Sequence, residues 1–262
     1  MRQSLPAIGA IMFLAAPALA VDHDNIDASR PLTFDDAETI AFGERAFEFG
    51  LRANAPYRRN ALGVNLSLEY LYGFRVNTHF SVDVDPSYGT QAGSRDTRAD
   101  VGDIGFGIQH NFNRETLKTP ALGVRADAYL PTGRGSQGMG VRLRGILSRT
   151  LRQYDRYHVN VDANFVSSPG AGERGFVPAV TLGYSAPVGY PRNFNRTVVA
   201  ELGTRISDDT DGGAIFNAGV GLRQQVTVRS VFDVGVQSDF AVTKFAPDRD
   251  NIRLVAGYST QF

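Results

Sequence analysis

The chain has 262 residues, carries 27 lysines and arginines against 27 aspartates and glutamates, and contains no cysteine. The balanced charge argues against a nucleic-acid partner, which calls for a basic excess, and the lack of cysteine excludes disulfide frameworks, thiolate metal sites and cysteine nucleophiles. A hydrophobic content of 42% is too high for a wholly disordered protein, and the length is compatible with one all-β unit.

The first 20 residues have the layout of a secretory signal peptide. Arg2 precedes an apolar run from Leu5 to Ala16, and the segment ends in the small-residue pattern Ala18-Leu19-Ala20. This run of about 12 residues is too short to span a bilayer, which takes about 20. We therefore expect cleavage after Ala20, and no later run approaches the length of a membrane-spanning helix.

Residues 21–44 form a second region with a different character. They are acidic and lack sustained alternation of apolar and polar side chains. We expect them to be a periplasmic N-terminal segment in front of a barrel at residues 45–262. The sequence leaves open whether this segment hangs in the periplasm or plugs the barrel.

From residue 45 onward, apolar and polar side chains alternate with a period of two. Phe47, Phe49 and Leu51 begin the pattern, which recurs in twelve segments of about ten residues without an intervening amphipathic helix. This period is typical of strands with one apolar and one polar face.

The links between these segments fall into two classes. Gly- or Asp-rich stretches follow the odd-numbered segments from the third onward, at residues 89–99, 131–140, 167–175, 207–213 and 243–250. The links after the even-numbered segments are short, apart from those around residues 113–120 and 187–196. Short turns at one end and long loops at the other are typical of outer-membrane barrels, with the long loops outside the cell.

Two soluble folds, a β-sandwich and a lipocalin-like barrel, also alternate in this way. A membrane barrel is favoured because the strand number is even, because charges occupy the second face of almost every strand, and because aromatic residues fall at the strand ends. The aromatic residues expected at the periplasmic rim are Phe47, Tyr72, Phe112, Tyr157, Tyr184, Phe232 and Phe262, and those at the outer rim are Tyr88, Phe165, Phe176 and Phe240. The fold class is therefore all-β: a single transmembrane antiparallel β-barrel of about 12 strands in the lipid of a Gram-negative-type outer membrane.

The C-terminal strand supports this interpretation. Alternate residues from Ile252 to Phe262 share one face, and Phe262 is the last residue of the sequence. This pattern resembles the C-terminal insertion signal of bacterial outer-membrane proteins, and it implies the barrel-insertion machinery as a partner.

Three short phrases carry a resemblance to a known family. They are Gly102-Asp103-Ile104-Gly105-Phe106-Gly107-Ile108-Gln109, then Pro120-Ala121-Leu122-Gly123-Val124-Arg125-Ala126, then Leu130-Pro131-Thr132-Gly133. With the leader at residues 32–38 and the ending Gly257-Tyr258 to Phe262, they resemble the transporter-like outer-membrane barrels associated with the meta-pathway of phenol degradation. The resemblance covers most of the mature chain and implies a channel-like role, with aromatic compounds among the solutes, but it transfers no specific site residues.

If the apolar face meets lipid, the other face lines a lumen of mixed charge. The candidate pore-lining and selectivity residues are Arg52, Glu69, Asp83, Asp85, Asp103, Arg125, Asp127, Arg142, Arg144, Glu201, Arg205, Arg223, Asp233 and Arg253. We expect a narrow pore constricted by Arg–carboxylate pairs, because twelve strands lie between filled eight-stranded and open sixteen-stranded barrels. Some apolar residues also point inward by parity, namely Val177, Ala179, Val199, Ile215 and Val255, and would contact either a partly apolar solute or an inward-folded segment.

Passive passage of small solutes is the leading function, with no enzymatic activity, cofactor or metal expected. One rival is a structural or ligand-binding barrel with a sealed lumen. Another is a lipid-modifying enzyme, because His79 and Ser81 repeat the His-x-Ser pair of a twelve-stranded outer-membrane phospholipase. The Asn-Gly that follows the serine in that enzyme is missing here, and both residues face inward by parity.

Overall fold

The computed structural model describes residues 30–56, 63–90, 97–134, 136, 138–152, 154–189, 195–241 and 249–262. The predicted signal peptide, residues 1–20, lies outside these residues, as do residues 21–29 of the N-terminal segment. In the described part of the chain, no helix is long and apolar enough to cross a membrane.

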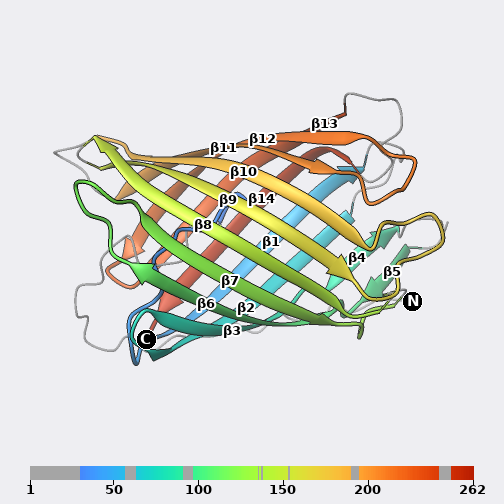
Figure 1. The fold of residues 1–262 in the computed structure, drawn as a ribbon, viewed down its shortest axis with the longest axis horizontal. Helices are drawn as coiled ribbons and strands as arrows, with labels where there is room; N and C mark the ends of the chain where they lie inside the picture. The colour runs from blue at the N-terminus through green and yellow to red at the C-terminus, as the bar shows by residue number, and fades with distance from the viewer. Residues whose placement is uncertain are drawn as a thin grey trace, which may run out of the picture.

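The described chain is a closed antiparallel cylinder (Figure 1). Its strands are β1 (Arg45–Pro56), β2 (Gly63–Arg75), β3 (Thr78–Val84), β4 (Ser87–Thr90), β5 (Thr97–Asp100), β6 (Ile104–Asn113), β7 (Ala121–Leu130), β8 (Gly140–Arg152), β9 (Asp155–Val166), β10 (Phe176–Pro187), β11 (Arg196–Ile206), β12 (Ala214–Thr227), β13 (Ser230–Ala241) and β14 (Asp250–Gln261). From β6 to β14 each strand pairs with the next along the chain, β2 pairs with both β3 and β4, and β3 and β4 pair with β6 and β5 respectively. β1 pairs with both β2 and β14, which closes the sheet.

The fourteen labelled strands make the twelve wall strands that the alternation predicts. β3 with β4 is one wall strand interrupted at residues 85–86, and β5 with β6 is another interrupted at residues 101–103. The two interruptions lie against each other, because a Cβ atom at Gly102 would collide with the backbone carbonyl of Asp85. Gly102 also has a φ of 79°, which glycine adopts without strain.

The two ends of the cylinder differ as expected. Short links join β2 to β3, β8 to β9 and β12 to β13 at the end that also holds the C-terminus, on the left of Figure 1. The β4–β5 hairpin and the β7–β8, β9–β10 and β11–β12 loops lie at the other end, on the right. The β6–β7 link, residues 114–120, is a longer link at the first end, as the sequence also indicates. We call these the periplasmic and outer ends, since outer-membrane barrels keep their short turns in the periplasm.

The apolar face of the wall points outward. Leu202, Val161 and Leu182 lie in the middle of their strands and are 63%, 53% and 52% exposed, whereas Asp127 and Asn160 on the opposite parity are buried. Nine of the eleven expected rim aromatics are exposed, namely Phe47, Phe112, Tyr184, Phe232 and Phe262 at one end and Tyr88, Phe165, Phe176 and Phe240 at the other. Tyr72 and Tyr157 are half-buried. An exposed apolar band with aromatic ends is the surface that a lipid bilayer requires, which confirms the predicted fold class.

The described part of the N-terminal segment, residues 30–43, lies inside the cylinder. Three small apolar clusters fix it to the wall: Leu32 and Phe34 with Val199; Ala37 with Ala121 and Ile146; and Ile40 with Ala46 and Leu71. The sequence left open whether these residues hang in the periplasm or plug the barrel, and in the structure they lie in the lumen. The interior is thus a packed core built partly from this segment.

Candidate functional site

The site is the lumen of the barrel together with residues 30–43, which we call the inner segment. The inner segment has no regular hydrogen-bonded structure, so its backbone groups are satisfied by polar side chains of the wall. The amide of Asp35 donates to Asn160 Oδ1 at 2.6 Å, and Asn160 Nδ2 donates back to the carbonyl of Asp35 at 3.0 Å. Ala37 is held in the same way: its amide donates to Ser148 Oγ at 3.0 Å, and its carbonyl accepts from Asn111 at 2.8 Å.

Charged contacts also hold the inner segment against the wall. Asp35 pairs with Arg144, which also bonds Asp162 through Nε at 2.6 Å. Burial raises the pKa of the Asp35 carboxyl, but the opposing effect of the nearby arginines, Arg144 first, is larger and holds the pKa below its usual range. The carboxylate is therefore ionised at neutral pH and forms a buried ion pair with the wall.

Two further acids of the inner segment contact one wall arginine. Arg156 Nη1 lies 3.0 Å from Asp36 Oδ2, and its Nη2 lies 3.3 Å from Glu38 Oε1. Two strands further along the wall, on β11, Glu201 Oε2 accepts from both the amide and the hydroxyl of Thr33, at 2.7 and 2.8 Å. The contacts thus come from several strands around the barrel, not from one side.

The wall is also shaped to receive the apolar side chains of the inner segment. The ring of Phe34 is fully buried and stacks on His158, with 4.8 Å between ring centroids. It sits over Gly183, where a Cβ atom would lie 2.6 Å from both Cδ atoms of the ring. Pro31 fills the space beside Gly235 in the same manner. Inward-facing glycines therefore leave the room that the inner segment occupies.

Four of the predicted lumen residues form one continuous network. Arg125 bonds Glu69 at 2.9 Å and Asp127 at 2.8 Å, and Arg142 bonds the other oxygen of Asp127 at 2.9 Å. The side chain of Arg142 keeps 24% of its surface exposed, against 6% for Arg125 and none for Asp127. In this network the carboxylate of Asp127 is covered, and the Arg142 side chain remains partly accessible.

The remaining predicted residues are spread over the interior. Arg144 and Glu201 contact the inner segment, Arg253 pairs with Asp239, and Arg205 pairs more loosely with Asp208 at 3.5 Å. Asp233 is fully buried, and Asp83, Asp103 and Arg223 are half-buried. Arg52 and Asp85 are exposed, Asp85 at the interruption between β3 and β4. The structure therefore brings some of the fourteen together in pairs but does not assemble them into one ring.

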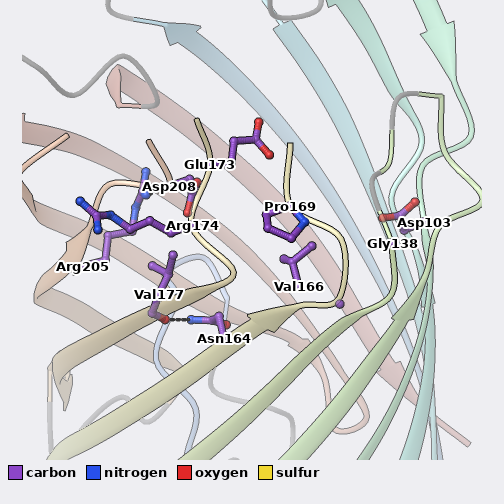
Figure 2. Close-up of a pocket in the computed structure, with 11 residues that line it drawn as sticks. Asp103, Gly138, Asn164, Val166, Pro169, Glu173, Arg174, Val177, Arg205 and Asp208 are labelled. Atoms are coloured by element: carbon purple, nitrogen blue, oxygen red, sulfur yellow. Dashed lines mark hydrogen bonds and ion pairs between the residues drawn. The ribbon is translucent and has the colours of Figure 1, made fainter. Parts of the chain in front are cut away.

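Two cavities open at the ends of the barrel. The outer one, of about 470 Å³, lies between the loops of β8 to β11 and is lined by Asn164, Val166, Pro169, Glu173, Arg174, Val177, Arg205 and Asp208 with Asp103 and two glycines (Figure 2). The inner one, of about 560 Å³, lies at the periplasmic end and is lined by residues 38–42 of the inner segment with Val76, Asn77, Asn111, Arg114 and Glu115. The inner segment and its wall contacts lie between these two openings.

The His79-x-Ser81 pair does not have the geometry of a catalytic dyad. Both side chains are buried inside the barrel, and Ser81 Oγ accepts a bond from Arg125 at 3.3 Å. Neither ring nitrogen of His79 has a hydrogen-bond partner among the described residues. Among those residues, no group of three or more histidines and acids is placed to hold a metal ion.

Sequence reasoning missed the wall residues that hold the inner segment, namely Gln109, Asn111, Ser148, Arg156, His158 and Asn160. Their inward parity was readable, but a polar inward residue is expected in any barrel. The more specific signal was the set of inward glycines, such as Gly183, since a lumen-facing glycine marks a place where something else fills the space.

Comparisons with known proteins agree with this fold. No family model and no curated relative matches the chain. Among solved structures, an outer-membrane channel from Pseudomonas putida F1 superposes with a TM-score of 0.69 at 15% identity, covering 87% of this chain and 98% of that one. The NanC porin gives a TM-score of 0.58 at 10% identity over 82% and 98%, and the KdgM porin 0.54 at 10% over 83% and 99%.

These identities are low, so the likeness supports the fold and not the association with phenol degradation. Together with the exposed apolar band and the polar interior, it identifies the chain as a twelve-stranded transmembrane β-barrel of the bacterial outer membrane.

Proposed function

We propose that this protein is a channel for the passive passage of small solutes across the outer membrane. The observation that carries the proposal is the polar, charged interior with a cavity opening at each end of the barrel. Arg52 is exposed and Arg142 is partly accessible, so both can contact a passing ion or solute. The channels and porins of the same fold support the same function.

We also propose that the inner segment is the gate. Its contacts lie between the two cavities, so a solute must pass residues such as Phe34 and Asp35. Those contacts are hydrogen bonds, ion pairs, apolar clusters and one ring stack to wall side chains, together with one backbone hydrogen bond from the amide of Gly43 to the carbonyl of Gly73 on β2 at 2.7 Å. None of them is part of the strand pairing of the sheet. The inner segment can therefore leave the lumen without breaking any strand pairing of the wall.

A reversible cross-link tests both proposals. The chain has no native cysteine, and the amide of Ala37 lies 3.0 Å from Ser148 Oγ, so Ala37→Cys with Ser148→Cys introduces a single pair of thiols across the contact. In planar bilayers the oxidised protein should show rare openings, and reduction should restore discrete conductance steps. Either single variant, treated in the same way, controls for the effect of the reductant. Equal conductance in the oxidised and reduced states would rule out the inner segment as the gate.

A sealed ligand-binding barrel is the second candidate, favoured by the complete burial of Phe34, Ala37 and Asn160. A sealed barrel should show no conductance, even after the cysteine pair is reduced and even when a substitution weakens the contacts of the inner segment with the wall. A folded barrel that stays silent in both states would establish it over the channel.

Three finer points belong to the same proposal. Aromatic or partly apolar solutes are expected, because Val177 lines the outer cavity. The barrel-insertion machinery is expected to bind the last strand, whose terminal Phe262 is 59% exposed, and Phe262→Ala should slow assembly in cells without changing the folded barrel. No enzymatic activity is expected, since Ser81 is bonded to Arg125 inside the barrel and does not face lipid.

A further inference from the structure

A row of polar side chains crosses the outward face of three neighbouring wall strands near the periplasmic end. Arg149 on β8 lies directly opposite Tyr157 on β9, and Tyr157 lies directly opposite Tyr184 on β10. Each of these residues lies two or three positions from the periplasmic end of its strand. The next outward row toward the middle of the membrane is apolar and consists of Leu147, Val159 and Leu182. The polar row therefore lies at the level where lipid headgroups meet the acyl chains.

The same face of the same strands carries no charge at the outer end. There the corresponding row is Val141, Phe165 and Phe176, and the two phenyl rings pack with 5.0 Å between their centroids. Aromatic side chains alone are enough to form the girdle of an outer-membrane barrel. The arginine at the periplasmic end is therefore an addition to the ordinary girdle.

The β6–β7 link holds Arg149 in place and brings a second cation close to it. Arg149 Nη2 donates to the carbonyl of Leu117 at 3.2 Å, and the next residue along the link, Lys118, is exposed. The link is itself fixed to β8, because the two carboxylate oxygens of Glu115 accept from the amide and the hydroxyl of Thr150 at 2.7 and 2.9 Å. Two cations thus lie at this part of the rim, while the carboxylate on the same link is bonded to Thr150.

Arg149 and Tyr157 keep hydrogen-bond donors for a ligand. Within the described ranges of the chain, the carbonyl of Leu117 is the one partner of the Arg149 guanidinium, and the Tyr157 hydroxyl bonds no residue. Tyr184 differs, because its hydroxyl donates to Asp155 Oδ2 at 2.9 Å. The acid at this end of the row is thereby held by Tyr184, and Arg149 and Tyr157 remain available on the lipid side.

A phosphodiester fits the available donors. The guanidinium presents parallel N–H groups that match two phosphate oxygens, and the Tyr157 hydroxyl adds another donor. The ammonium of Lys118 adds positive charge on a flexible side chain. The apolar row at Leu147, Val159 and Leu182 continues from the same strands in the direction that acyl chains take. Because free phosphate has no acyl chains to lie on this row, the surface favours a lipid phosphate.

We propose that Arg149, Tyr157 and Lys118 form a binding site for an anionic phospholipid in the periplasmic leaflet. The phosphate pairs with Arg149 and Lys118, and the acyl chains lie along Val159 and its outward neighbours. A glycerol headgroup leaves the lipid with a net negative charge, whereas a choline headgroup carries a cation that the two basic side chains repel. The site lies on the outside of the wall, so it is separate from the lumen and its proposed function.

A single tryptophan can report on this site, because the chain has none of its own. Val159→Trp places an indole in the apolar row next to Tyr157 and keeps every proposed ligand of the phosphate. In vesicles of phosphatidylcholine, quenching by phosphatidylglycerol with brominated acyl chains measures the preference for the anionic lipid at this position. We expect a preference of about 5- to 25-fold, since each cation near an anionic bilayer surface contributes about fivefold.

Variants of this reporter protein separate the site from net charge. Arg149→Gln should lower the preference by about fivefold, and so should Lys118→Gln, which changes only an exposed residue of the link. Arg45→Gln is the matched control. Arg45 is exposed at the periplasmic end of β1, on the opposite side of the cylinder, with its guanidinium 5.7 Å from the centroid of the Tyr72 ring. Its replacement removes the same charge at the same rim and should leave the preference unchanged.

A second reporter compares the two ends of one strand. Ala163→Trp lies two residues from Phe165 on the outward face of β9 and should show little preference for phosphatidylglycerol. Equal preference at the two reporters, or equal loss in Arg149→Gln and Arg45→Gln, would reduce the effect to net charge and overturn the proposal. A preference that survives both Arg149→Gln and Lys118→Gln would overturn it as well.

Inorganic phosphate tests the alternative source of the same anion. If it removes the preference where sodium chloride of equal ionic strength does not, the site takes free phosphate and the lipid proposal is wrong. Quenching needs no ion current, so these results do not depend on whether the barrel conducts. An Arg149-dependent preference in a barrel that never conducts supports the lipid site and refutes the channel, and a conducting barrel without the preference does the reverse.

Discussion

Gly183→Ala offers the sharpest test of the inner segment as a gate. The new methyl group would lie 2.6 Å from both Cδ atoms of Phe34, and an ordinary carbon–carbon contact is about 3.5–4.0 Å, so the ring must move by roughly 1 Å. Phe34 is fully buried and stacked on His158, so it has no free space into which to retreat within its seat. Overpacking of this kind costs about 1–3 kcal/mol, which corresponds to roughly a 5- to 150-fold shift toward the displaced inner segment.

The assay is the open probability of single channels in a planar bilayer. Gly145→Ala is the matched control, because a Cβ atom at Gly145 would meet nothing within 4 Å. Gly183→Ala should raise the open probability, and Gly145→Ala should leave it unchanged. Circular dichroism and the melting temperature of both variants check that the wall still folds.

A double-mutant cycle with Phe34→Ala isolates the contact. Phe34→Ala removes the ring and should itself raise the open probability. If the effect of Gly183→Ala acts through that ring, adding it to Phe34→Ala changes nothing further, because the two residues are in contact and their effects do not add. Full additivity, or identical behaviour of Gly183→Ala and Gly145→Ala, would refute the reasoning.

Three more outcomes are expected. Asp35→Asn removes the charge that the inner segment presents to Arg144 but leaves Arg144 paired with Asp162. Channel openings, measured by conductance, should therefore become roughly 10- to 100-fold more frequent. The melting temperature of the wall, measured by circular dichroism, should change little. Arg142→Gln should lower the chloride-to-potassium permeability ratio by about fourfold, because a unit charge about 10 Å from an ion in water contributes about 0.4 kcal/mol, with opposite sign for the anion and the cation. An unchanged reversal potential in a salt gradient would show that Arg142 does not face the ion path. Leu202→Arg, at mid-strand on the outer face, should destabilise the barrel in vesicles by about 2–4 kcal/mol in a urea titration, whereas Leu117→Arg in the β6–β7 link should have almost no effect.

The wall of this protein was predictable because its determinants are local. A period of two assigns each residue of a strand to a face from its immediate neighbours alone. The placement of Leu202 outward and Asp127 inward therefore needed no knowledge of distant contacts. Closure followed from the requirement that every strand edge be paired in lipid.

The partners inside the lumen could not be read in the same way. Arg125 and Arg144 lie directly opposite each other on β7 and β8, an arrangement that a rule for neighbouring strands would count as repulsive. Each guanidinium instead turns to carboxylates elsewhere: Arg125 to Glu69 on β2, and Arg144 to Asp162 and to Asp35. The alternation along a strand predicts which face of the wall a residue lies on. Which carboxylate an arginine pairs with depends instead on how far its long side chain reaches across the lumen.

The position of the inner segment was undetermined for a related reason. Asp35 and Asn160 are 125 residues apart in sequence, and the segment around Asp35 has no periodicity that marks a buried face. The local traces of its position lie on the wall: inward apolar residues such as Val199, which packs on Leu32 and Phe34, and inward glycines such as Gly183 and Gly235. Such a trace becomes informative once the strand faces are known.

Only Glu44 separates the inner segment from the first residue of β1, and this connection makes the inner segment a tethered ligand of its own barrel. After release, about 14 residues of flexible chain would keep it within roughly 20 Å of the periplasmic mouth. Its local concentration there is on the order of millimolar. If the inner segment were a separate peptide, a binding free energy of about 4 kcal/mol would give it only millimolar affinity for the lumen. Because the segment is tethered, contacts of that strength are enough for it to occupy the lumen half of the time. Closing needs no second molecule, and its extent does not depend on how much protein the membrane contains.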